Sequence, residues 1–156
     1  MSDSFSLYVV DEKNLPAARQ GRSDRQMYEA LVESVRARGA KWGELNTWTL
    51  DLAQALERID EQLGATKFLP VLAFNNSPQN VLGDDSDCPS FGYFNPKQVK
   101  DLSTVLGRLP GSFVEELSRD EDDTAETVLA AFQSAAEEAA RRGYALAILH
   151  ASEDAV

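Results

Sequence analysis

The sequence predicts an α+β fold, in which about four to five helices pack against a small mixed sheet. Three observations lead to this prediction. Long segments of helical periodicity alternate with a few short apolar segments, which are too few for a doubly wound sheet. Capping residues mark the ends of several of these helices. The 156 residues form a single predicted domain, 1–156, large enough to bury a core without disulfides or a metal.

Short apolar segments supply the predicted strands. Residues 6–10 are β-prone and apolar on both faces, which is typical of a central strand. Residues 91–94 form a brief strand, and residues 144–150 form the last one. Residues 68–74 also resemble a strand, but Pro70 removes a donor from the ladder. We therefore expect an edge strand or an irregular strand start there.

The most clearly marked helix follows Ser23. Ser23 and Gln26 have the spacing of a capping box, and Gly39 supplies a stop after two arginines. Between them, apolar residues recur at helical spacing and define one buried face. These residues are Tyr28, Leu31, Val32 and Val35.

Similar signals mark the starts of the other helices. Asp51 with Gln54, and Ser112 with Glu115, have capping-box spacing, so we expect helices to begin after Asp51 and Ser112. Asn95, Pro96 and Gln98 supply the N-cap, N1 and N3 residues of another helix. Asp123 with Glu126 precedes the last, alanine-rich helix, which ends at Gly143.

The chain is strongly acidic, with a net charge of −11 and an isoelectric point near 4.5. Nucleic acids and anionic membrane surfaces repel such a chain, so neither is an expected partner. Residues 1–48 hold seven acidic and seven basic residues, so the whole excess lies after residue 48. Two interpretations stay open: the acidity serves solubility, or it forms a negative face that attracts a basic protein partner.

The cysteine content and the lengths of the apolar runs bear on the cellular location of the protein. Cys88 is the only cysteine, which excludes an internal disulfide and a paired-cysteine zinc or redox site. Residues 1–5 lack the basic and apolar regions of a secretion signal, and the apolar runs are too short to span a membrane. We therefore expect a soluble, cytoplasmic protein.

The longest non-periodic segment covers residues 75–90, and loops of this length are often functional. It contains the candidate binding residues Asp84, Asp85, Asp87 and Cys88. The three aspartates offer oxygen ligands to a hard cation, but the spacing is not that of an EF-hand. Because of this mismatch, a solvated acidic loop is the favoured interpretation, and we predict no metal site.

Catalytic motifs are missing from the sequence. Cys88 and His150 make up the only possible nucleophile–base pair, and His150 is more simply the end of a strand. The sequence has no glycine-rich phosphate loop, no GxSxG elbow and no HExxH motif. We predict no catalytic residues and no cofactor.

Two further features allow both a binding and a structural interpretation. The acidic residues 120–123 fit a docking patch for a basic protein or a helix N-terminus. Trp42 and Trp48 lie in a less regular stretch, where they fit exposed binding hot spots or the edge of a core.

The C-terminal part of the chain resembles a known family. Residues 91–99, FGYFNPKQV, resemble the aromatic strand and capped helix of the bacterial YfbM-like family of domains of unknown function. The alanine- and acid-rich segment 125–142 and the strand after Gly143 also resemble that family, and residues 6–11 do so loosely. The resemblance implies an α+β fold and carries no catalytic residues with it.

Together these features predict a non-enzymatic protein-binding module. It would engage a basic partner through an acidic surface after residue 48, and one version is an immunity-type protein that neutralises a basic toxin. The alternative is a small enzyme or ligand-binding protein with a site under the 75–90 loop. That alternative requires a cleft that gathers Asp84, Asp87, Cys88 and His150.

Overall fold

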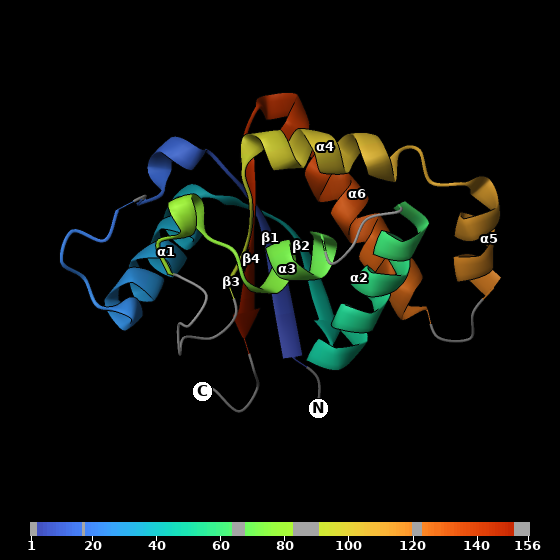
Figure 1. The fold of residues 1–156 in the computed structure, drawn as a ribbon, viewed down its shortest axis with the longest axis horizontal. Coiled ribbons are helices and arrows are strands. Elements are labelled where there is room, and N and C mark those ends of the chain that lie inside the picture. Colours follow the sequence, from blue (N-terminus) through green and yellow to red (C-terminus); the bar gives the residue numbers. More distant parts are fainter. Residues whose placement is uncertain (1–2, 17, 64–67, 83–90, 120–122, 152–156) are drawn as a thin grey trace.

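The computed structural model describes residues 3–16, 18–63, 68–82, 91–119 and 123–151. Its centre is a four-stranded sheet in the order β2-β1-β4-β3, with every neighbouring pair antiparallel (Figure 1). The strands are β1 (Asp3–Val10), β2 (Ala40–Thr47), β3 (Phe91–Phe94) and β4 (Ala145–Ala151). The α+β prediction is confirmed, but the sheet is antiparallel and not mixed as predicted. Within the described residues, the parallel pairing is limited to one isolated bridge between Asn75 and Phe91.

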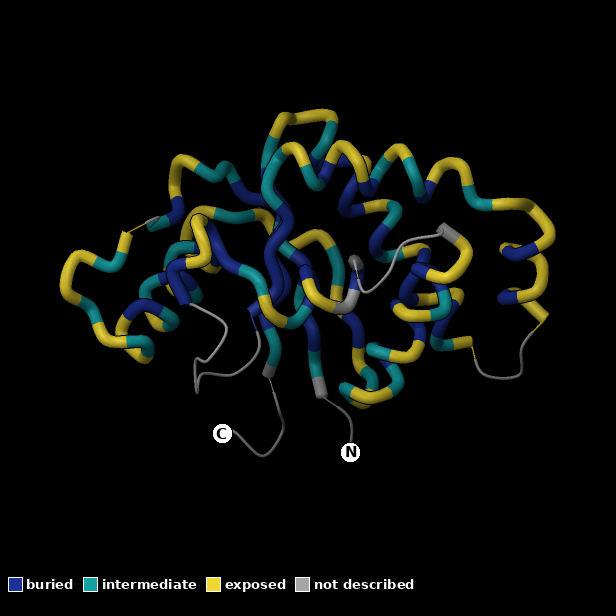
Figure 2. The backbone as a smooth tube through the Cα atoms, in the orientation of Figure 1, coloured by how far each residue is buried: buried dark blue, intermediate teal, exposed yellow. Residues whose placement is uncertain are grey.

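Helices cover both faces of this sheet. The α-helices are α1 (Asp24–Arg38), α2 (Thr49–Leu63), α3 (Phe68–Phe74), α4 (Pro96–Leu106), α5 (Gly111–Arg119) and α6 (Thr124–Arg142), and the 3-10 turns are η1 (Glu12–Asn14) and η2 (Pro78–Asn80). Helix α1 lies on one side, and α2, α4 and α6 lie on the other (Figure 1). Figure 2 shows the buried residues concentrated in the sheet and on the inward sides of the helices.

Strand β1 occupies a central position, as predicted. Phe5 and Leu7 belong to the larger core, beneath α2, α4 and α6. Val10 belongs to the smaller core, beneath α1. Because successive strand residues point to opposite faces, a central strand with a core on each side is apolar on both.

Local capping is confirmed at three helix ends. Ser23 and Gln26 form both bonds of a capping box at α1, and Asn95 and Gln98 do the same at α4. At the end of α6, Gly143 adopts φ 71°, a left-handed conformation that is costly for residues with a side chain. These signals involve only residues three or four positions apart, so their effect does not depend on the rest of the fold.

Two predicted helix starts are wrong by one turn or less. Helix α2 begins at Thr49, and the N–H of Leu52 donates to the carbonyl oxygen of Trp48 at 3.0 Å. Asp51 therefore lies inside the first turn, where a carboxylate still favours the helix dipole. Helix α5 begins at Gly111, so Ser112 is also inside its helix. Asp123 precedes α6 as predicted, but its side chain makes no capping hydrogen bond.

The predicted strand at residues 68–74 is wrong, because this segment forms helix α3. Pro70 falls in the first turn, where a missing N–H costs nothing. Helix α3 packs directly on β3 at Gly92, where a Cβ would lie only 2.2 Å from the carbonyl oxygen of Ala73. The periodicity of such a short apolar segment does not distinguish a strand from a buried helix. Its secondary structure is therefore set by the segment against which it packs.

Candidate functional site

The candidate loop residues Asp84, Asp85, Asp87 and Cys88 lie outside the described residues. His150 is described and lies on β4, where its ring stacks on Phe5 with centroids 4.6 Å apart and an interplanar angle of 10°. This packing agrees with the interpretation of His150 as a strand-end residue. Because Cys88 is outside the described residues, the structure does not test whether it pairs with His150.

The described start of that loop, residues 75–82, is held firmly against β3. The backbone N–H of Asn76 donates to the carbonyl oxygen of Phe91 at 3.1 Å. Its side-chain Nδ2 donates to the carbonyl oxygen of Tyr93 at 2.6 Å. The Ser77 hydroxyl accepts the N–H of Leu82 at 3.2 Å. The chain therefore enters the Asp-rich segment from a fixed position.

Arg19 fastens the same segment from another part of the sequence. Its Nε donates to the carbonyl oxygen of Val81 at 2.8 Å, and its Nη2 donates to that of Leu82 at 3.3 Å. The guanidinium also pairs with the carboxylate of Asp24, the first residue of α1. Sequence reasoning missed Arg19, because its partners are backbone carbonyls more than 60 residues away.

A second polar contact joins β3 to the turn after β1. The Tyr93 hydroxyl donates to the Glu12 carboxylate, and Tyr93 is otherwise buried beneath α1. Burial, together with this hydrogen bond and the Glu12 charge, raises the pKa of the Tyr93 hydroxyl far above its ordinary value. The contact holds a neutral tyrosine in place, which is a structural task.

A depression of about 470 Å³ lies beside α1, and its described lining comes from that helix alone. Tyr28 and Val32 supply apolar side chains to its lining, and Glu29, Glu33 and Arg36 supply charged ones. His150 is not among its lining residues. The ligand-binding alternative depends on Asp84, Asp87 and Cys88, which lie outside the described residues, so it stays an untested prediction.

The negative charge concentrates at the end of the molecule built by α2, α5 and the start of α6 (Figure 1). We call this surface the acidic end. Arg58 and Arg119, two basic residues of this region, pair with Glu116 at 3.4 Å and Glu115 at 3.5 Å. The carboxylates of the acidic end are those of Asp51, Glu57, Glu61, Glu115, Glu116, Asp123 and Glu126.

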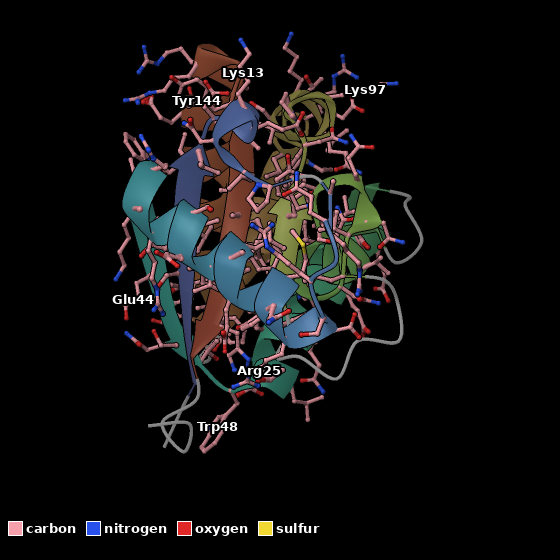
Figure 3. All side chains as sticks on the ribbon, turned by 90° about the vertical axis from the view of Figure 1, so that its left-hand side faces the viewer. Lys13, Arg25, Glu44, Trp48, Lys97 and Tyr144 are labelled. Carbon is pink, nitrogen blue, oxygen red and sulfur yellow. The ribbon has the colours of Figure 1, made fainter. Side chains whose placement is uncertain are left out.

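Exposed apolar side chains adjoin the acidic end. Trp48 and Leu50, at the start of α2, are 53% and 67% exposed. Leu50 begins a solvent-facing stripe that continues through Gln54, Glu57 and Glu61. In Figure 3, Trp48 and Arg25 lie toward one end of the molecule, and Lys13 and Lys97 lie at the other end. The exposed indole of Trp48 therefore lies away from these two lysines.

Trp42 has a different environment. Its Nε1 donates to the Ser134 hydroxyl on α6 at 3.0 Å, and its side chain is 40% exposed. It therefore covers the junction of β2 and α6, whereas Trp48 projects into solvent. Trp42 therefore agrees with the interpretation as the edge of a core. Trp48 is exposed, as the interpretation as a binding hot spot requires.

Fold and surface together define an α+β protein with an acidic helical end. Comparisons of the chain with protein-family models, with curated proteins and with solved structures found no match. The resemblance to the YfbM-like family therefore stays a prediction. Among the described helices, none has the length and apolar character needed to cross a membrane.

Proposed function

We propose that this chain is a cytoplasmic, non-enzymatic binding module that engages a basic protein partner through its acidic end. The observation that supports this most is the distribution of ion pairs. Arg58 and Arg119 are already paired within this end. Within the described part of the chain, no basic group forms an ion pair with five of its carboxylates. These are Asp51, Glu57, Glu61, Asp123 and Glu126.

The arrangement of these carboxylates favours a positively charged partner. Glu57 and Glu61 lie four residues apart on the exposed side of α2, where like charges repel and destabilise the helix. A lysine or arginine of a partner would relieve that repulsion. Trp48 and Leu50 supply the apolar anchors that tight interfaces require, and an indole also attracts cations over its face.

One concrete version of this proposal is an immunity-type protein that neutralises a basic toxin. Its acidic end would cover a basic surface of the toxin, and opposite charges would accelerate the encounter. Association of this kind weakens as salt screens the charges. Salt dependence is therefore the first property to measure.

The test is affinity capture from an extract of the native cell at about 0.05 M and about 0.5 M salt, followed by measurement of Kd for each retained protein. We expect a basic protein that is retained at the lower salt concentration and released at the higher one. Glu57→Lys/Glu61→Lys should weaken its binding by at least about tenfold.

The matched control is Glu29→Lys/Glu33→Lys, which makes the same charge change on exposed positions of α1. Helix α1 lies at the opposite end of the molecule from α2 (Figure 1). The control should bind as the unaltered chain does. Equal losses in the two variants, or retention of acidic proteins only, would contradict a site at the acidic end.

A further inference from the structure

The two edge strands of the sheet, β3 and β2, differ in how far neighbouring residues cover them. The edge of β3 is covered by Asn75 and Asn76. Asn75 forms a β-bridge with Phe91, and Asn76 donates hydrogen bonds to the carbonyl oxygens of Phe91 and Tyr93. On the opposite edge, no group of the described residues hydrogen-bonds to the outward backbone of β2. With respect to the described residues, this edge strand of eight residues offers a row of donors and acceptors to another strand.

The side chains of β2 carry a self-complementary charge pattern. Lys41 lies opposite Tyr8 and Glu44 opposite Ser6, with an irregularity in register between them. Because the extra residue there is Trp42, Lys41 and Glu44 share one face of the sheet although they are three positions apart. Lys41 Nζ lies 2.9 Å from Glu44 Oε2, and both side chains are nearly half exposed. Figure 3 shows Glu44 at the margin of the molecule.

We propose that β2 pairs antiparallel with β2 of a second copy of this chain, about a two-fold axis between Trp42 and Gly43. In this register Lys41 lies opposite Glu44 of the second copy, and the symmetry makes this pair twice. Directly opposed side chains in an antiparallel ladder approach closely enough for opposite charges to attract. The two sheets then join into one continuous sheet of eight strands.

The same register fills a gap on the other face. A Cβ on Gly43 would meet no atom within 4 Å, so the space beside this glycine is open. Trp42 of the second copy lies opposite Gly43, and its partly exposed indole can cover the glycine. Ala40 then lies opposite Leu45 of the second copy, which adds an apolar pair. Charge and shape therefore favour one register over its neighbours.

The net charge of −11 on each copy opposes association, so the test is made at about 0.15 M salt, where long-range repulsion is screened. Sedimentation velocity across a concentration series should show a monomer–dimer equilibrium. Hydrogen exchange should show slower exchange of β2 backbone amides as the dimer fraction rises, with α1 amides unchanged. The exchange measurement needs no variant, so it does not depend on the folding of one.

Charge variants test the register. Lys41→Glu should raise the dimer dissociation constant by about tenfold or more, because two attractive pairs become repulsive. Lys41→Glu/Glu44→Lys should restore dimerisation to within about threefold, because the swapped pattern is again self-complementary. Arg25→Glu is the matched control: it makes the same charge change at another exposed ion pair, that of Arg25 and Glu29, and should leave the dimer unchanged.

Three results would each overturn the proposal. The first is a monomer at every concentration, and the second is a dimer whose β2 amides exchange as fast as in the monomer. The third is equal weakening by Lys41→Glu and Arg25→Glu. The proposal is independent of partner binding at the acidic end, so either can fail alone.

Discussion

The carboxylate of Asp60 accepts the backbone N–H of Leu69 through both oxygens, at 3.2 and 3.1 Å. Asp60 lies on α2 and is only 3% exposed, and Leu69 is the second residue of α3. The first N–H groups of a helix have no partner within it, so α2 supplies an N-terminal cap to α3. The negative charge also favours the positive end of the helix dipole.

Removal of this cap should destabilise the protein. We expect Asp60→Ala to lower the free energy of unfolding by about 2 kcal/mol, because a buried N–H loses its acceptor. Asp60→Asn keeps one acceptor oxygen and should cost about half as much. Urea unfolding measures both values. The exposed neighbour Glu61→Ala should change stability by less than about 0.5 kcal/mol, and an equal loss there would remove the capping explanation.

The close approach of α3 and β3 predicts a severe effect of a single methyl group. Gly92→Ala places a Cβ 2.2 Å from the Ala73 carbonyl oxygen, so backbone must shift, and we expect a loss of about 2 kcal/mol or more. Gly111→Ala meets nothing within 4 Å, and its effect should stay within about 1 kcal/mol. Thermal unfolding of the two variants measures this difference. Similar melting temperatures for Gly92→Ala and Gly111→Ala would argue against the tight contact.

Arg19 should control local opening of residues 75–82. Arg19→Ala removes both donors to the carbonyl oxygens of Val81 and Leu82, so the amide hydrogens of this segment should exchange about tenfold faster. Arg19→Lys should rescue this only partly, because an ammonium lacks the planar fork. Hydrogen exchange resolves the effect by segment. Arg22→Ala serves as the control, and unchanged exchange in Arg19→Ala would contradict the fastening role.

The Tyr93–Glu12 contact predicts an alkaline limit to stability. Because the folded pKa of Tyr93 is raised above its ordinary value of 10.0, this group contributes stability below pH 10 that declines as the pH rises further. In the unaltered chain, part of the tyrosinate absorbance should therefore appear only on unfolding. Tyr93→Phe should lose that component and flatten the alkaline decline. Persistence of the component in the variant would assign it to another tyrosine.

Glu138 predicts the opposite limit, in acid. The hydrogen bonds from Arg141, followed by the charge of Arg142, hold the pKa of this nearly buried carboxyl below its ordinary value of 4.5. A depressed folded pKa gives stability that is present above pH 4.5 and is lost as the pH falls below it. Glu138→Gln should therefore weaken the chain at neutral pH and reduce its acid sensitivity. Urea midpoints across the pH series measure this, with the exposed Glu137→Gln as the control.

Local signals in the sequence determined the α+β class, the central position of residues 6–10, and the capped starts of α1 and α4. Ser23 and Asn95 each bond to a residue three positions away, so these caps form whatever surrounds them. The charge distribution after residue 48 is likewise a property of the sequence. Its concentration on α2 and α5 follows only from the folded chain.

Tertiary contacts decided the rest. Residues 68–74 are a helix because Asp60 caps its N-terminus and because Gly92, which has no side chain, lets the helix pack closely on β3. Neither contact is local in sequence. Residues 40–47 lack a regular apolar pattern and became β2 because they pair with β1 at the edge of the sheet. A periodic sequence pattern reports one buried face, whereas caps from distant carboxylates, close glycine contacts and edge pairing depend on which segments the fold brings together.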